Sequence, residues 1–189
     1  MLERLKSWDA ELFIYLNSFG MESWDGFWLF VTNTATWIPL FLLMFFLIYK
    51  VYGLKKGALV LLYFLGAVLI SLALMITTKY FVARVRPSSV PELAELIRAL
   101  QKPDSYSFYS GHASSSFVIA TFAVLAFRRA YKWVYVFLIF PLLFTVSRIF
   151  VGVHYPSDLL VGALIGTFLA YIFYKRCELS LRRTTIQNH

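Results

Sequence analysis

Three clusters of polar and ionisable residues lie where apolar segments of the sequence begin or end. Charged side chains are costly at bilayer depth, so their presence at such positions is a functional hypothesis by default. Taken singly, each cluster has a plainer explanation as a headgroup anchor or as the start of a helix. Together they predict one cationic pocket that contains two histidines. The clusters are Lys79 to Pro87, then Ser110, Gly111 and His112, then Ser147, Arg148, His154 and Asp158.

The residue types in these clusters suit the chemistry of phosphate. Phosphoryl transfer spreads negative charge over the equatorial oxygens, and its catalysis depends mainly on positioning and electrostatic stabilisation. Lys79, Arg86 and Arg148 supply fixed positive charge, and each guanidinium can bind two phosphate oxygens. Ser110 and Gly111 open a predicted helix, whose unpaired N–H groups can bind the same anion. We therefore predict that these five residues bind phosphate.

The spacing of the clusters resembles that of the type 2 phosphatidic acid phosphatase family, which shares its site with vanadium haloperoxidases and bacterial acid phosphatases. The first motif matches at Lys79, six intervening residues, Arg86 and Pro87, and the core of the second matches at 110–112. The third matches at 147–148, five residues, His154, three residues and Asp158. The sequence departs from the family at Tyr109, where proline is common. The resemblance implies a membrane lipid phosphatase.

Three residues are expected to be catalytic, namely a nucleophile, the carboxylate that orients it and a general acid. His154 would attack phosphorus in line and form a phosphohistidine, which water then hydrolyses. Asp158 follows four residues later, a spacing that lets it accept the other ring N–H and fix the tautomer. His112 is placed to act as a general acid toward the leaving oxygen.

A metal-dependent phosphatase is the main chemical alternative. A site for a hard divalent cation needs several carboxylates. Asp158 is the only acidic residue at the motif positions of the three clusters, and the other charged residues there are cations. We therefore expect a reaction without a metal ion and without any other cofactor.

The composition places these clusters in a membrane protein. Of 189 residues, 60% are hydrophobic and only 15% are charged, and the mean hydropathy is +0.69. The formal net charge of +8 would suggest nucleic-acid binding in a soluble protein. Here the basic residues flank apolar segments, where they orient the chain in the bilayer. We expect no nucleic-acid partner and no obligate protein partner.

Five segments approach the length of about 20 residues that crosses a bilayer. We predict an all-α fold, a polytopic transmembrane helical bundle of about five spans, formed by a single membrane-embedded domain over residues 1–189. Gly162 and Gly166 in the last segment would permit close helix contact. The segments are 28–49, which has a polar beginning, 57–78, 113–127 with its flanks, 133–151 and 157–174.

Two further helices are predicted at the membrane surface. Apolar residues between Leu5 and Phe19 recur at steps of three and four, which predicts an N-terminal amphipathic helix in the interface. The segment Pro91 to Leu100 shows a similar pattern, and we interpret it as a short interfacial helix over the active site.

Basic residues predict the orientation of the chain. Clusters at 50–56, 128–132 and 175–183 share one side, which should be cytoplasmic. The three chemical clusters then lie on the outer side. The small size favours a bacterial inner-membrane protein whose active site faces the periplasm or the cell exterior.

The predicted function is hydrolysis of a membrane lipid phosphate or diphosphate, with the lipid and the bilayer as the partners. Undecaprenyl diphosphate and phosphatidylglycerol phosphate are the favoured substrates, and lipid A and phosphatidic acid are the alternatives. A transporter of phosphate or anionic lipid is the alternative from another class, since the same arginines could form a binding ring. A catalytically idle lipid-binding relative is a further alternative.

Overall fold

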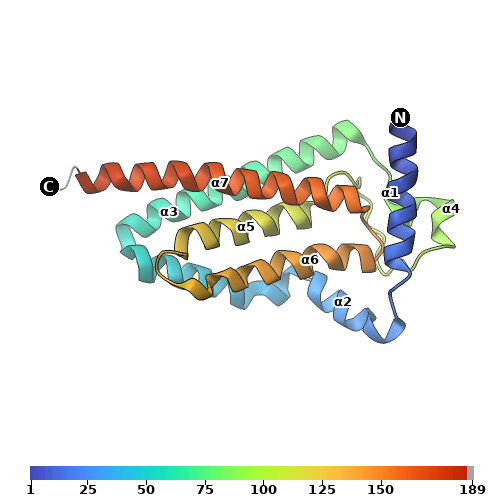
Figure 1. Cartoon of the computed structure of the whole chain (residues 1–189), viewed down its shortest axis with the longest axis horizontal. Coiled ribbons are helices and arrows are strands. Elements are labelled where there is room, and N and C mark those ends of the chain that lie inside the picture. The colour runs from blue at the N-terminus through green and yellow to red at the C-terminus, as the bar shows by residue number, and fades with distance from the viewer. Residues whose placement is uncertain (187–189) are drawn as a thin grey trace.

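The computed structural model describes residues 1–186, and within that range the regular elements are all helical. The α-helices are α1 (Leu2–Asn17), α2 (Asp25–Thr32), α3 (Ile38–Val82), α4 (Pro91–Ala94), α5 (Gly111–Phe127), α6 (Ile139–Phe150) and α7 (Pro156–Ile186). Four short 3-10 helices are η1 (Glu22–Trp24), η2 (Thr34–Trp37), η3 (Pro87–Ser89) and η4 (Lys132–Leu138). The long helices lie side by side in one bundle (Figure 1). This arrangement confirms the predicted all-helical class.

Helix α3 folds back on itself and forms two arms of the bundle (Figure 1). The reversal occurs at Gly53, whose φ of 68° and ψ of −174° lie outside the helical region. A positive φ of this kind is easily adopted only by glycine. The predicted span 57–78 lies on the second arm. The predicted span 28–49 is divided among α2, η2 and the first arm, because Asn33 leaves the helix and its side chain accepts from the N–H of Ala35.

In the described part of the chain, three helical stretches are long and apolar enough to cross a membrane. They are Thr34–Ala94, Lys132–Phe150 and Pro156–Arg183, and the first of them contains both arms of α3. Helix α5 is apolar but shorter. These stretches confirm an integral membrane protein.

Helices α5 and α7 form the closest contact of the bundle. A Cβ atom built on Gly166 would lie only 2.2 Å from the carbonyl oxygen of Ser114, and one on Gly162 would lie 2.7 Å from that of Ser110. The two backbones therefore meet as the spacing of the glycines predicts. Because Ser110 precedes α5 and Asp158 lies in the first turn of α7, this contact fixes the predicted phosphate-binding residues beside the predicted orienting carboxylate.

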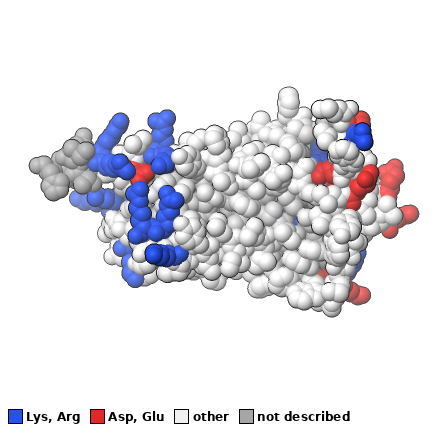
Figure 2. All heavy atoms as spheres, viewed as in Figure 1, with Lys and Arg blue, Asp and Glu red and all other residues white. Residues whose placement is uncertain are grey.

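Helix α1 lies crosswise over one end of the bundle (Figure 1). Its inner face buries Phe13 and Asn17, whereas Leu5, Trp8 and Leu12 are each about half exposed. Exposed apolar residues thus lie beside exposed charged residues such as Lys6 and Glu11 on the outer side of the helix, a combination that suits a membrane surface. Lys and Arg side chains gather at the opposite end, around the C-terminal part of α7 (Figure 2).

The predicted helix from Pro91 to Leu100 forms only its first turn, Pro91–Ala94. The backbone donors that would continue it are bonded elsewhere. The N–H of Arg98 donates to Oδ1 of Asn17, and the N–H of Leu100 donates to the carbonyl of Val151. The predicted helix was therefore too long. The residues after Ala94 bond to α1 and to the loop before α7 instead of continuing the helix.

Candidate active site

A cavity of about 590 Å³ opens at the end of the bundle that α1 covers, where α5 and α7 begin. Six of the eight predicted site residues line it, and Ser110 and Asp158 lie behind its wall. The predicted residues in the lining are Lys79, Arg86, Gly111, His112, Arg148 and His154. The rest of the lining is uncharged and consists of Leu29, Thr32, Asn33, Thr34, Met75, Gln101, Pro103 and Ser105.

The His154 imidazole is held at both ring nitrogens. Its Nδ1 lies 3.3 Å from Oδ2 of Asp158, and its Nε2 lies 3.0 Å from a terminal nitrogen of Arg86. A guanidinium only donates, so Nε2 must accept, and the proton of the neutral ring is then on Nδ1 facing Asp158. Complete burial lowers the pKa of His154 to about 3, so the ring is neutral at physiological pH. This tautomer leaves the lone pair of Nε2 as a nucleophile.

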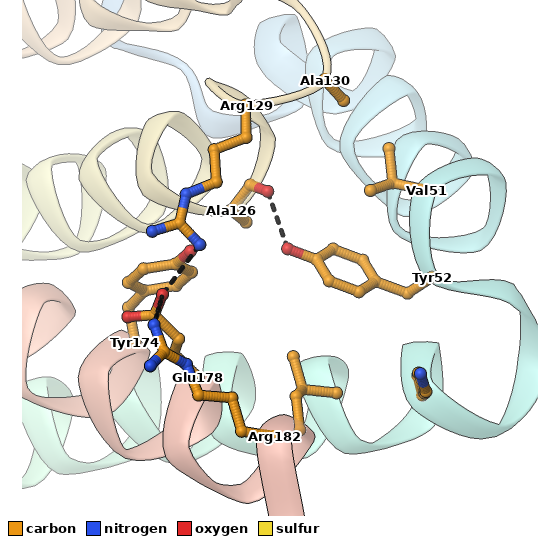
Figure 3. Close-up of a pocket in the computed structure, with 10 residues that line it drawn as sticks. Val51, Tyr52, Ala126, Arg129, Ala130, Tyr174, Glu178 and Arg182 are labelled. Carbon is orange, nitrogen blue, oxygen red and sulfur yellow. Dashed lines mark hydrogen bonds and ion pairs between the residues drawn. The ribbon is translucent and has the colours of Figure 1, made fainter. Parts of the chain in front are cut away.

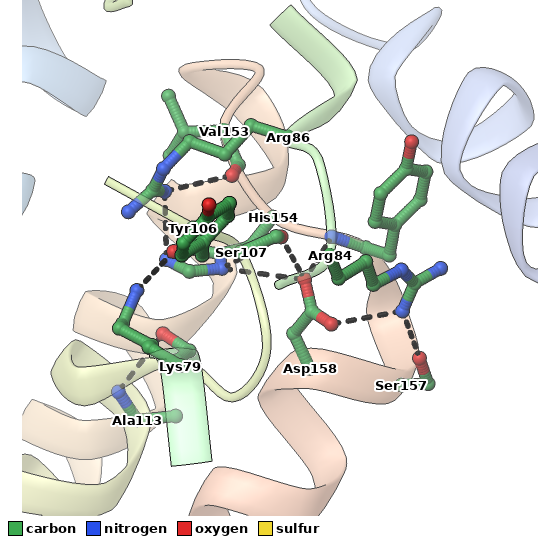
Figure 4. Close-up of polar contacts among 12 residues, drawn as sticks. Lys79, Arg84, Arg86, Tyr106, Ser107, Ala113, Val153, His154, Ser157 and Asp158 are labelled. Carbon is green, nitrogen blue, oxygen red and sulfur yellow. Dashed lines mark hydrogen bonds and ion pairs between the residues drawn. The ribbon is translucent and has the colours of Figure 1, made fainter. Parts of the chain in front are cut away.

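Asp158 is the centre of the hydrogen-bond network behind His154 (Figure 4). Its side chain is fully buried. Besides the imidazole it accepts from the N–H of Tyr155 at 3.0 Å, from the hydroxyl of Ser107, and from Arg84 at 2.8 Å. In the contact to Tyr155, an acidic side chain in the first turn of α7 accepts from the backbone N–H of the residue that precedes the helix, as in a capping box. The start of α7 therefore fixes the carboxylate that orients His154.

Arg84 and Asp9 belong to this network and were not predicted. Arg84 donates to Asp158 and, through its other terminal nitrogen, to Oδ2 of Asp9 at 2.7 Å. Asp9 also accepts from the N–H of Ser157 at 2.9 Å, and the Arg84 guanidinium lies 3.8 Å over the Tyr155 ring. Asp9 is one of three acids in α1, and Glu3 and Glu11 are exposed, so no signal in the sequence distinguished it. Helix α1 thus reaches the orienting carboxylate through one arginine.

Three buried cations surround the cavity. Lys79 is 9% exposed, Arg86 is 5% exposed and Arg148 is 4% exposed. Among residues 1–186, the groups that bond Lys79 and Arg148 are all neutral. The carbonyl of Tyr106 accepts from Lys79, and Thr32 and Gln101 accept from Arg148.

Arg86 is held by neutral groups in the same way. It donates to the carbonyl of Ser105 at 2.6 Å, to that of Val153 at 2.9 Å and to His154. Among the described residues, the Nε of Arg148 is buried without a hydrogen-bond partner. Buried charges are normally paired. Because Asp158 already faces Arg84, this surplus of positive charge fits an anion in the cavity.

The start of α5 supplies a different kind of anion donor. Ser110 is the N-cap, and its hydroxyl accepts from the N–H of Ala113 at 3.4 Å. Its own N–H donates to the carbonyl of Asp158 at 3.1 Å. The hydroxyl of Ser110 is therefore used within the chain and satisfies the N–H of Ala113, whereas the N–H groups of Gly111 and His112 precede the first intrahelical donor and lie at the positive end of the helix. Gly111 lines the cavity at this point.

The His112 ring lies in the cavity wall against Phe144, with 4.7 Å between the ring centroids. No hydrogen bond to this ring is found in the part of the chain that the structure describes. Its nitrogens are therefore available to a group in the cavity, as the prediction of a general acid requires. Within residues 1–186, no group of three or more His, Cys, Asp or Glu side chains has the arrangement of a metal site.

The fold and the site together define an enzyme of the membrane, a helical bundle that brings a buried histidine, a second, partly buried histidine and three buried cations to one end. The PAP2 superfamily profile matches residues 60–180, and the chain belongs to this family. It is a membrane phosphatase, as its motifs predicted. The match includes all eight predicted site residues.

Individual relatives agree with this assignment. The chain is 30% identical to a lipid A 4'-phosphatase of Bacteroides thetaiotaomicron, over 92% of this chain and 79% of that protein. It is also 30% identical to an undecaprenyl-diphosphatase of Sulfolobus acidocaldarius, over 87% of this chain and 76% of that protein. Both names are those of phosphatases, which favours an enzyme over the transporter considered above.

A solved structure shows the same fold. It is a transmembrane PAP2 type phosphatidylglycerolphosphate phosphatase from Bacillus subtilis, and the TM-score is 0.73 at 20% sequence identity. The similarity covers 93% of this chain and 87% of that chain.

Proposed function

We propose that this protein hydrolyses the phosphate of a membrane lipid through a phosphohistidine on His154, without a metal ion. One observation carries the proposal. The Nε2 atom of His154 has its lone pair directed to Arg86 at the wall of a cavity with surplus positive charge, while Asp158 holds the opposite nitrogen. A covalent intermediate divides one difficult step into two easier ones.

In the first step the lipid phosphate enters the cavity and takes over the donors of Arg86, Arg148 and Lys79. The lone pair of Nε2 forms the N–P bond, and the bond between phosphorus and the lipid oxygen breaks. His112 gives its proton to that oxygen, which leaves as an alcohol or as a lipid phosphate. Asp158 accepts the Nδ1–H throughout and stabilises the positive charge that develops on the ring.

In the second step a water molecule attacks phosphorus from the face that the lipid has left. His112, now neutral, takes a proton from this water, and the P–N bond breaks to return the electron pair to Nε2. Inorganic phosphate leaves, and His112 carries the proton needed for the next cycle. The amides at the start of α5, at Gly111, bind the phosphoryl oxygens in both steps because their positions are fixed by the helix.

Arg84 and Asp9 act at one remove from the reacting atoms. Neither side chain lines the cavity. Arg84 holds the second carboxylate oxygen of Asp158, and Asp9 holds Arg84 together with Ser157. We assign both as positioning residues that keep Asp158 directed at the Nδ1 atom of His154.

The relatives narrow the choice of substrate. The motifs alone favoured undecaprenyl diphosphate and phosphatidylglycerol phosphate, with lipid A as an alternative. The relative named for the 4'-phosphate of lipid A aligns over a larger share of this chain than the one named for undecaprenyl diphosphate. We therefore place a lipid A 4'-phosphate first and undecaprenyl diphosphate second.

The membrane arrangement completes the proposal. The two arms of α3, together with α5, η4 with α6, and α7, form five passes of one domain over residues 1–189, of which 187–189 lie outside the described range. The basic end faces the cytoplasm. Helix α1 and the active site then lie at the outer surface of a bacterial inner membrane, where a headgroup enters while its acyl chains stay in lipid.

The chemical proposal is tested with purified protein in detergent that contains EDTA. We expect phosphate release from the preferred lipids, and an acid-labile phosphoryl adduct on His154 after rapid quenching. His154→Ala should abolish both the adduct and the turnover, because it removes the acceptor of the phosphoryl group. Phosphate release by His154→Ala at the normal rate, or loss of wild-type activity that only magnesium restores, would contradict the mechanism.

The orientation is tested with single cysteines at Ser89 and Arg183, both exposed, in a Cys177→Ser background. A membrane-impermeant thiol reagent applied to spheroplasts should label position 89 and leave position 183 unlabelled. The opposite pattern would place hydrolysis at the cytoplasmic surface.

A further inference from the structure

The end of the bundle remote from the active site contains a second cavity, of about 570 Å³ (Figure 3). It lies between the Gly53 reversal of α3, the C-terminal end of α5 and the second half of α7. Its walls combine apolar, tyrosine and charged side chains. The lining residues that matter here are Val51, Ala126, Ala130, Arg129, Glu178 and Arg182.

Two arginines from different elements converge on one carboxylate in this cavity (Figure 3). Arg129, just after α5, lies 2.8 Å from Oε1 of Glu178, and Arg182, on α7, lies 3.3 Å from the same oxygen. The Glu178 side chain is only 12% exposed, whereas the arginine side chains are 70% and 67% exposed. Each guanidinium has five N–H donors, so most of the donors face outward beside the cavity.

The charge in the cavity favours an anionic ligand. Arg129, Arg182 and Lys56 line it against the single carboxylate of Glu178. Guanidinium groups bind phosphate oxygens in pairs, which fits a phosphodiester between Arg129 and Arg182.

The position of the cavity favours a lipid as the source of that anion. The cavity is bounded by the ends of apolar helices, and Val51, Ala126 and Ala130 give it apolar walls. Basic pockets between membrane helices on the cytoplasmic side are typical sites for anionic headgroups. We propose that this cavity binds the phosphodiester headgroup of an anionic membrane lipid, which bridges α3, α5 and α7 from the side opposite the active site.

The orientation of the chain in the membrane does not by itself require this arrangement. It requires only positive charge at this end, which Arg128 and Arg176 also supply. Both are exposed, and neither lines the cavity. The proposal therefore predicts a difference between two pairs of arginines that contribute the same charge to the same end of the molecule.

The test compares Arg129→Gln/Arg182→Gln with the matched control Arg128→Gln/Arg176→Gln. Each purified protein is titrated in neutral detergent with short-chain phosphatidylglycerol or phosphatidylcholine, and bound lipid is counted by native mass spectrometry. Wild type and the control pair should retain phosphatidylglycerol in preference to phosphatidylcholine. The cavity pair should bind phosphatidylglycerol at least about tenfold more weakly, from the loss of two headgroup contacts.

Several results would overturn the proposal. They are an equal loss in both double variants, no preference of the wild type for the anionic lipid, and displacement of the lipid by millimolar inorganic phosphate. The last would assign the cavity to a free phosphate ion. Phosphatase turnover on a short-chain lipid phosphate, in detergent without phosphatidylglycerol, should be normal in both variants. Normal turnover verifies their folding, because the active site is at the other end of the bundle. Should the cavity pair fail to fold, Arg182→Gln alone gives the same comparison against Arg176→Gln.

Discussion

Replacing Asp9 tests whether a residue outside the active-site cavity controls His154, the proposed nucleophile. The carboxylate is 12% exposed and accepts from Arg84, from the N–H of Ser157 and from the hydroxyl of Ser157. Asp9→Asn keeps the shape, removes the charge and turns one acceptor into a donor. Hydrogen bonds to charged groups contribute about 1.5 to 3 kcal/mol each. The amide can still accept once, so we expect a loss of roughly 2 kcal/mol in the free energy of unfolding.

The effect on catalysis should appear in kcat. Without the charge of Asp9 the Arg84 guanidinium loses one of its two carboxylate partners and is held less firmly against Asp158, so the tautomer of His154 is held less well. We expect kcat to fall about tenfold, which corresponds to about 1.4 kcal/mol in the barrier. KM should change little, because Asp9 and Arg84 do not line the cavity. Arg84→Gln should cost about a hundredfold, since it leaves a buried carboxylate without its cation.

The assay measures kcat and KM on a short-chain lipid phosphate in detergent, together with the thermal midpoint. Glu11→Gln is the matched control, because Glu11 is exposed on α1 and bonds only to Ser7 among the described residues. Arg84→Lys keeps the charge and should recover part of the activity lost in Arg84→Gln. The reasoning is refuted if Asp9→Asn lowers the thermal midpoint while kcat stays normal, or if Arg84→Lys is no better than Arg84→Gln.

Three other perturbations probe separate parts of the structure. His112→Ala should reduce turnover by about a hundredfold or more for an alkyl phosphate and much less for an aryl phosphate whose leaving group needs no proton; an equal loss for both would exclude a general acid. Gly166→Ala should lower the thermal midpoint, at a cost of about 1 to 3 kcal/mol, because its Cβ meets the backbone of Ser114, whereas Gly26→Ala, with no atom within 4 Å, should not. The pKa of His154 is lowered from 6.5 to about 3, so the unfolded chain binds more protons between these values and stability should rise with pH across that interval. In His154→Gln the measured slope should be smaller, and an unchanged slope would show that the burial of His154 is not its cause.

Much of the candidate site could be predicted because its residue types suit phosphate chemistry and stand at the ends of apolar segments. Lys79, Ser110 and His154 follow or precede apolar segments that end on the same side of the bundle. Because successive spans cross the membrane in alternate directions, these three residues are predicted on the same side without knowledge of any tertiary contact. The Asp158 position needed only a local rule, since a residue four positions on faces the same side of a helix start.

The residues that could not be predicted are those whose roles depend on tertiary packing. Asp9 and Arg84 are 75 positions apart, and their contact exists only because α1 lies crosswise over the end of the bundle. Thr32 and Gln101 bond Arg148 for a similar reason, since α2 ends at the cavity and the loop after α4 closes over it. The helix predicted from Pro91 to Leu100 ends early for the same reason, because the backbone N–H groups of Arg98 and Leu100 bond to residues distant in sequence.

Asp158 connects the two halves of the active site through separate atoms. Its side chain orients His154, while its backbone carbonyl accepts the N–H of Ser110 at the start of α5. The proposed nucleophile, His154, and the proposed anion-binding end of α5 are therefore positioned by one residue in the first turn of α7. Gly162 permits this arrangement, because any side chain there would press against the carbonyl of Ser110 and separate the two helices. A small residue one turn beyond Asp158 is thus part of the geometry that holds the start of α5 beside the carboxylate and His154.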